Sequence, residues 1–219
     1  MDPLIIFLVS SWFFYFLIHS FLASITVKAF FASKFSAVMP YYRLTFNFLA
    51  VFLLIIPLWL TIVWSGEWLW QWTGVLEWLS HGISILAIVG FLWSLKFYDT
   101  SEFLGLRQLS ENNTSVDDQE HFQLSPLHRF VRHPWYFFAL VLIWVRDMNL
   151  AMLISTVMMS LYFIIGSWYE EKKLIRYHGK IYQRYRELVP GLIPLPWKFL
   201  SKTQMKKLLD SNDYDSQSR

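Results

Sequence analysis

LIIFLVSSWFFYFLIHSFLAS, the stretch Leu4–Ser24, contains no Asp, Glu, Lys or Arg. A helix needs about 20 apolar residues to cross the hydrocarbon core of a bilayer. The stretch has that length, so it is predicted to be a transmembrane helix. Asp2 precedes it where a secretory signal peptide would carry basic residues, so we expect this segment to stay in the protein as a first span.

Further apolar segments predict four more membrane helices: Leu44–Trp64, Ile83–Tyr98 (extended back through Val75), Phe137–Val145 and Leu150–Trp168. Phe137–Val145 is too short to cross alone, so its helix would have to begin near Pro126 and bend at Pro134. Only Arg146–Asn149 separates it from the last segment, which predicts a tight antiparallel hairpin. The predicted fold is all-α: a polytopic membrane helical bundle of about five transmembrane helices with a cytoplasmic C-terminal helical lid.

The composition agrees with a bilayer protein and excludes several kinds of site. Hydrophobic residues make up 55% of the 219 residues, aromatic residues 20%, and the mean hydropathy is +0.37. The chain has no cysteine, which excludes disulfides, thiolate metal ligands and a cysteine nucleophile. The net charge of +3 does not support a nucleic-acid partner. The histidines show no metal-ligand spacing, so we expect no metal.

Basic residues alternate between the loops and predict the orientation. Lys28 and Lys34 lie in the first loop, the second loop has no Lys or Arg, and the C-terminal segment is strongly basic. The positive-inside rule then places the N-terminus outside and the C-terminus in the cytoplasm. We expect one domain with four parts: three transmembrane helices over 1–98, a cytoplasmic loop over 99–125, a core over 126–197 and a tail over 198–219.

Ionisable side chains gather where the last two spans meet the cytoplasm. His128, Arg132 and His133 come just before Pro134, and Glu170-Glu171 follows the last span. Because the two spans form a hairpin, we expect these groups to lie at the same depth and close together. The alternative is that they are interfacial anchors and a solvated helix end.

Two other features, one polar and one aromatic, each leave two interpretations open. His19 lies in the middle of the first span, where it is either functional or bonded to a neighbouring helix. Tyr182 and Tyr185 share a helix face and either pack in a core or hold a cation such as a sulfonium.

Two sets of motifs resemble a known family. The first set resembles the C-terminal core of the isoprenylcysteine carboxyl methyltransferase superfamily of integral membrane methyltransferases: Arg132-His133-Pro134-Trp135-Tyr136, Glu170-Glu171, Gly179 with Tyr182 and Tyr185, and Val189-Pro190. The second set resembles the bacterial subgroup of methanethiol S-methyltransferases and nitrite and nitric oxide reductase U-like proteins: His19-Ser20, Ala23-Ser24, Lys28 and Glu102–Gln108.

The resemblance implies S-adenosylmethionine as methyl donor, a location in the bacterial inner membrane, and a small or lipophilic acceptor, a thiol, that enters from the bilayer. It assigns catalytic roles to Arg132, His133 and Glu171, and low-priority substrate contacts to His19, Arg107 and Gln108. The implied cofactor-binding residues are His128, Arg132, His133, Pro134, Tyr136, Glu170, Glu171, Tyr182 and Tyr185. His133 would accept the thiol proton, and Arg132 would lower the thiol pKa or anchor the cofactor carboxylate. One of the two glutamates would bind the cofactor or hold Arg132.

Three other functions stay open at this point. The acceptor can be a larger lipid-linked molecule, such as a prenylcysteine carboxylate or a phospholipid. The protein can instead be a nicotinamide-dependent membrane reductase, because sterol reductases resemble the same core. It can also be a non-enzymatic accessory membrane protein of nitrogen-oxide metabolism.

Overall fold

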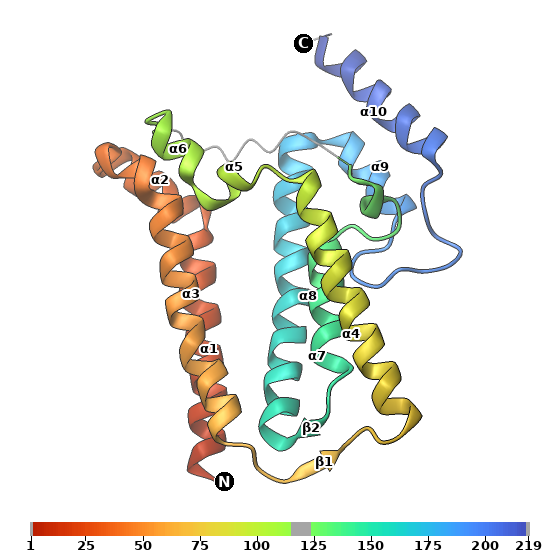
Figure 1. The fold of residues 1–219 in the computed structure, drawn as a ribbon. Helices are drawn as coiled ribbons and strands as arrows, with labels where there is room; N and C mark the ends of the chain where they lie inside the picture. Colours follow the sequence, from red (N-terminus) through yellow and green to blue (C-terminus); the bar gives the residue numbers. More distant parts are fainter. Residues whose placement is uncertain (1, 115–123, 218–219) are drawn as a thin grey trace. The chain divides into compact units, whose positions relative to one another are not determined.

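Four long apolar helices dominate the computed structural model, which describes residues 2–114 and 124–217 (Figure 1). Within those residues, four helices are long and apolar enough to cross a membrane: α1 (Pro3–Ala23), α3 (Met39–Val63), α4 (Val75–Ser94) and α8 (Leu150–His178). The predicted all-α polytopic membrane bundle is confirmed. The first span begins where expected because the Asp2 carboxylate accepts a hydrogen bond from the Leu4 N–H, which caps the helix.

The chain divides into two compact units, which are described separately. The first consists of the described parts of Met1–Thr73, Tyr98–Gln119 and Arg146–Met159. The second consists of the described parts of Gly74–Phe97, Glu120–Val145 and Ser160–Arg219. In this division α4 belongs with α7, in the second unit. The predicted parts, with limits at residues 98, 125 and 197, stay a prediction. That the whole chain is one domain stays a prediction.

In the first unit, α1 packs on α3 around a buried polar contact. The indole N–H of the fully buried Trp12 donates to the Ser155 hydroxyl at 2.9 Å, and that hydroxyl lies 2.6 Å from the Thr61 hydroxyl. In an apolar surrounding such hydrogen bonds hold helices together, since the polar groups find no water there. They tie the start of α8 to α1 and α3.

Short elements close the two ends of this unit: α2 (Ile25–Lys34), η1 (Ser36–Val38), α5 (Thr100–Leu104), α6 (Leu106–Ser110), and the antiparallel strands β1 (Trp68–Trp70) and β2 (Met148–Asn149). The carbonyl of Phe103 accepts hydrogen bonds from Arg43 and Asn47, so α5 lies against the start of α3. Gly105 has a φ of +88°, and a Cβ there would come within 2.7 Å of the Leu44 nitrogen. The first basic loop and the 99–111 segment thus lie at the same end of α3, and the β1–β2 ribbon lies at the other end. This agrees with the predicted alternation of the loops.

In the second unit, α4 packs closely on α7 (Pro134–Trp144). The Trp135 indole donates to the Ser94 hydroxyl at 2.8 Å, and Gly90 lies against the Phe138 ring. The 3₁₀ turn η2 (Leu95–Phe97) ends α4.

The helices α7 and α8 form the predicted antiparallel hairpin. The Trp144 indole donates to the Ser160 hydroxyl at 3.0 Å near one end, and the Tyr136 hydroxyl donates to Glu170 at 3.2 Å near the other. The condition under which the short segment Phe137–Val145 would span, a helix that begins near Pro126, is not met. Residues 126–129 form a separate 3₁₀ turn, η3 (Pro126–Arg129), and α7 begins only at Pro134.

Pro134 is the physical reason that α7 does not begin earlier in the chain. His133 precedes Pro134 and has a φ of −121° and a ψ of 75°, outside the helical region that a following proline disfavours. With 11 residues α7 is only about 16 Å long, so it is the short member among the predicted spans.

The C-terminal part forms the predicted helical lid: α9 (Lys180–Leu188), a loop, and α10 (Lys202–Gln217). Gly179 starts α9 with a φ of +57°, which permits the sharp turn out of α8. The buried core of the lid consists of Tyr182, Tyr185, Val189, Leu200 and Leu208. It packs against the end of α8 through Leu174 and Ile175.

Candidate functional site

Arg132 and Glu171 form an ion pair in the second unit. Nη2 of Arg132 lies 2.7 Å and Nε lies 2.8 Å from Oε1 of Glu171, and both side chains are nearly buried. Nη1 of Arg132 donates to the carbonyls of Arg186, at 2.9 Å, and Val189. Every nitrogen of this guanidinium therefore has a partner within the protein, and the side chain joins the start of α7 to the end of α8 and to the lid.

His133 is buried between the two adjacent glutamates. Its Nε2 lies 3.1 Å from Oε1 of Glu171, and its Nδ1 lies 3.4 Å from Oε2 of Glu170. Burial alone lowers the pKa of His133, but the hydrogen bonds to the two carboxylates outweigh it and raise the pKa to about 9. The ring is therefore an imidazolium at neutral pH.

The lid is attached to this cluster through its backbone. The Arg132 N–H donates to the Pro190 carbonyl at 2.9 Å, and the His133 N–H donates to the Gly191 carbonyl at 3.1 Å. A Cβ on Gly191 would lie 3.3 Å from Nη2 of Arg132, which is tighter than an ordinary contact. The absence of a side chain at 191 lets the lid pass directly over the ion pair.

Glu170 presents the most accessible charged group of the cluster, with 43% of its side chain exposed. Its Oε2 accepts a hydrogen bond from the Tyr136 hydroxyl. The Tyr136 ring stacks on the His133 ring with centroids 5.4 Å apart, and on the other side it stacks on Phe163 at 5.0 Å. A carboxylate beside a column of aromatic faces can receive a cation or a hydroxyl-bearing ligand.

His128 is neutral, in contrast to His133. Burial, together with the positive charge of His133, lowers the pKa of His128 to about 4. Its Nδ1 accepts from the backbone N–H of Ser125 at 3.1 Å and lies 2.8 Å from that residue's hydroxyl. The carbonyl of His128 accepts from the Tyr185 hydroxyl at 2.7 Å. This histidine shapes the turn before α7 and links it to α9.

Proteins similar to this chain carry one recurring name. Methanethiol S-methyltransferase 2 of Bradyrhizobium diazoefficiens is 30% identical over 128 residues, which cover 57% of this chain and 49% of that protein. A methanethiol S-methyltransferase of a Pseudomonas strain is 33% identical over 139 residues, 61% of this chain and 50% of its own. The chain is similar to methanethiol S-methyltransferases. A third such protein, from Crocosphaera subtropica, is 28% identical over 141 residues and covers 57% of this chain and 54% of its own.

The resemblance inferred from the motifs is thus confirmed. The chain spans about half the length of the curated relatives it matches. No family model matches the chain, and no solved structure does either.

The structure brings together the residues expected at the cytoplasmic ends of the hairpin, so their predicted proximity is confirmed. Pro134 is the first residue of α7, directly after His133. Tyr182 and Tyr185 are only 2% and 1% exposed, within the core of the lid. This placement favours the packing interpretation for the tyrosine pair. The catalytic and cofactor-binding roles of all these residues stay predictions.

The three candidate substrate residues lie in the first unit. The His19 ring contacts the rings of Tyr15 and Phe46, at 5.7 and 5.0 Å between centroids. Arg107 is exposed and pairs with Asp99, Glu102 and Glu111. In the described part of the chain, Oε1 of Gln108 is buried without a hydrogen-bond partner. Their roles also stay predictions.

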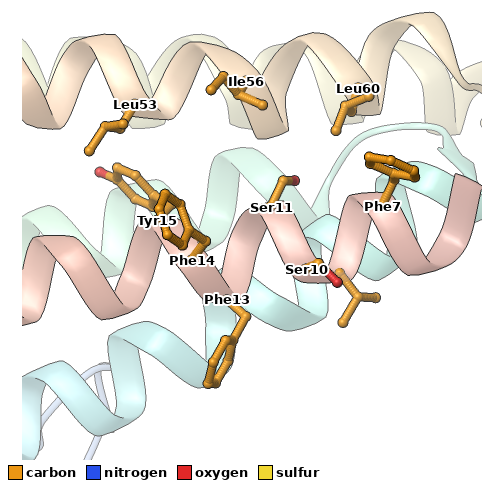
Figure 2. A pocket seen from close by; sticks show the side chains of 10 residues that line it. Phe7, Ser10, Ser11, Phe13, Phe14, Tyr15, Leu53, Ile56 and Leu60 are labelled. Atoms are coloured by element: carbon orange, nitrogen blue, oxygen red, sulfur yellow. The ribbon is translucent and has the colours of Figure 1, made fainter.

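Two further observations concern sites of other kinds. A groove of about 550 Å³ lies between α1 and α3, and Figure 2 shows a mostly apolar lining that includes the hydroxyl-bearing side chains of Ser10, Ser11 and Tyr15. Phe7 and Phe13 in that lining are more than half exposed, as expected for a surface that faces lipid. Among residues 2–114 and 124–217, no group of His, Asp and Glu is arranged to hold a metal ion.

Sequence reasoning missed the part that the lid backbone plays. The motif Val189-Pro190 and the following Gly191 were visible, but the carbonyls of Arg186, Val189 and Gly191 carry the contacts. Every residue type has a main-chain carbonyl, so the sequence does not show which carbonyls accept these hydrogen bonds. The only available signal was a glycine next to a proline in a segment that follows an amphipathic helix.

Proposed function

We propose that this protein is a membrane methyltransferase that uses S-adenosylmethionine and transfers the methyl group to a small or lipophilic thiol. The observation that carries the proposal is the cluster of Arg132, His133, Glu170 and Glu171 at one end of the α7–α8 hairpin. The similarity to methanethiol S-methyltransferases supports the same reaction class.

The charges of the cluster suit the proposed cofactor. Two cations face two carboxylates, so the ionised cluster is neutral and adds no repulsion toward a positively charged ligand. Tyr136, whose hydroxyl lies next to Glu170, would contact the ribose hydroxyls of the cofactor. When bound, S-adenosylmethionine supplies an electrophilic methyl group on a sulfonium.

Arg132 acts as a positioning residue in this proposal. Its nitrogens are already engaged by Glu171 and by the lid carbonyls, so it is not placed to anchor a cofactor carboxylate. Glu171 in turn holds Arg132 and His133. The pair keeps the lid closed over the hairpin and excludes water from the reacting groups.

A thiol acceptor must release its proton as the new carbon–sulfur bond forms. His133 is a poor acceptor for that proton, because both of its ring nitrogens face carboxylates and the raised pKa keeps it protonated. Glu170 is the more exposed of the two carboxylates in the cluster, with 43% of its side chain accessible. We therefore assign the proton to Glu170, with His133 as the adjacent positive charge that holds this carboxylate in place.

The test uses the purified protein in nanodiscs with methyl-labelled S-adenosylmethionine and three acceptors: methanethiol, a prenylcysteine and a phospholipid. The expected result is label in the thioether product. Label in the prenylcysteine ester or in the lipid would show that this molecule, and not a thiol, is the methyl acceptor. No transfer to any acceptor, with oxidation of a nicotinamide cofactor instead, would overturn the proposal.

A further inference from the structure

Residues 191–200 form a closed loop between α9 and α10, in blue in Figure 1. Both ends of the loop are attached to the segment just before α7. The Gly191 carbonyl accepts from the His133 N–H at 3.1 Å, and the Leu200 N–H donates to the Arg129 carbonyl at 2.9 Å. The Arg129 side chain also donates to the Leu200 carbonyl at 2.8 Å. The base of the loop is therefore fixed next to the first residue of a membrane helix.

The tip of the loop is also constrained. The Lys198 N–H donates to the Leu195 carbonyl at 3.0 Å, which closes a tight turn. Pro194 and Pro196 restrict the backbone on either side of Leu195. A loop held in this way presents its side chains in a defined direction.

The side chains presented by the tip are large, apolar and unburied. Ile193 is 65% exposed and Trp197 is 79% exposed. The exposed rings of Phe130 and Phe199, at the base of the loop, stack on one another with centroids 5.9 Å apart. Large apolar side chains held exposed on one short loop indicate a binding surface.

We propose that this loop docks on the bilayer, with Ile193 and Trp197 inserted into the lipid–water boundary. The loop is attached at residues 129 and 133, directly before Pro134, where α7 begins, so its tip lies close to the level at which that helix meets the membrane. Tryptophan prefers that boundary. Lys198 directly follows Trp197, and the exposed Lys202 begins α10, so the loop carries basic residues that attract lipid phosphates. The lid then has two attachments, one to the ion pair of Arg132 and Glu171 and one to lipid.

The absence of cysteine from the chain makes a direct test possible, because a single introduced cysteine gives a unique spin label. The variants are Ile193→Cys and Trp197→Cys, each in vesicles of phosphatidylcholine and phosphatidylglycerol. Gln183→Cys on the exposed face of α9 is the aqueous reference, and Leu86→Cys, 70% exposed on α4, is the lipid reference.

The measurement is the accessibility of each label to oxygen, which concentrates in lipid, relative to a water-soluble nickel complex. Labels at 193 and 197 are expected to show a ratio several-fold above the label at 183 and close to the label at 86. A ratio equal to that at 183 would place the loop in water and overturn the proposal. Exclusion of both reagents would also overturn it, since a protein surface would then cover the patch. Neither outcome depends on methyl transfer.

Discussion

Oε1 of Glu171 accepts a hydrogen bond from Nε of Arg132 at 2.8 Å, and Nη2 of the same guanidinium lies 2.7 Å from that oxygen in an ion pair. The side chains are 12% and 9% exposed, so neither charge can turn to water if the other is removed. This pair connects the start of α7 to the end of α8, so its loss is expected to weaken the fold.

Glu171→Gln is expected to destabilise the protein, because it leaves the Arg132 charge buried without a counter-charge, at a cost of about 3 kcal/mol. The measurement is the thermal unfolding transition in detergent, followed by tryptophan fluorescence. Arg107→Gln is the matched control: its ion pairs are exposed to solvent, and little change is expected. An unchanged transition for Glu171→Gln would show that the pair does not hold the lid.

Stability is expected to fall as the pH rises through about 9. The folded protein raises the pKa of His133 from its ordinary value near 6.5 to about 9. The resulting stabilisation is fully present below pH 6.5 and is lost as the folded imidazolium deprotonates. Melting temperatures from pH 6 to pH 10 measure it, and His133→Gln should flatten the decline. An equally steep decline in that variant would show that other titratable groups cause the loss of stability at high pH.

Gly191→Ala is expected to lower both activity and stability, because its Cβ would lie 3.3 Å from Nη2 of Arg132, which is held by the ion pair with Glu171. Gly166→Ala in α8 is the control. Nothing lies within 4 Å of a Cβ there, and alanine favours the helix. The measurements are the initial rate of methyl transfer and the melting temperature. If the two substitutions change the rate and the melting temperature equally, the space over the ion pair is wide enough for a side chain at position 191.

Gly90→Ala is expected to separate α4 from α7. Its Cβ would come within 2.6 Å of the Phe138 ring, and overpacking of that kind costs about 1–3 kcal/mol. Gly82→Ala in the same helix has open space around the Cβ and should be tolerated. The unfolding transitions of the two variants test the helix contact without reference to any activity.

Glu170→Gln is expected to keep the fold and lose turnover, since Glu170 is exposed and lies outside the Arg132 ion pair. The amide keeps the shape of the side chain but cannot take up the thiol proton. The measurement is the rate of label transfer together with the melting temperature. Wild-type rates in this variant would remove Glu170 from the reaction while leaving the structural role of Glu171 intact.

Much of the architecture was predictable because membrane spans follow from length and hydropathy. The helix α1 differs from the predicted first span by one residue at each end, and α8 begins at the predicted Leu150. The proximity of Arg132 to Glu171 was also predictable, since a short connection forces two helices into a hairpin. The start of α7 was not, because the sequence alone left open whether the chain bends at Pro134 or stops being helical there.

The contacts of the lid show why the rest could not be predicted. The backbone carbonyls of Val189 and Gly191 meet Arg132 and His133 across more than 50 positions in the sequence. Such contacts depend on the path of the chain through space and not on the residue types. The choice between Glu170 and Glu171 depended likewise on which side of α8 each carboxylate faces relative to α7.

The hydrogen bonds from Arg132 to main-chain carbonyls of the lid affect which residues of this protein can change over evolution. Because Arg186 contributes its main-chain oxygen, its exposed side chain can be exchanged while the hydrogen bond to the guanidinium persists. Substitution of that side chain is thereby uncoupled from the geometry of the charged cluster. Substitutions at Arg132 and Gly191 are instead expected to disturb the cluster, because one of these residues forms the ion pair and the other lies directly against it.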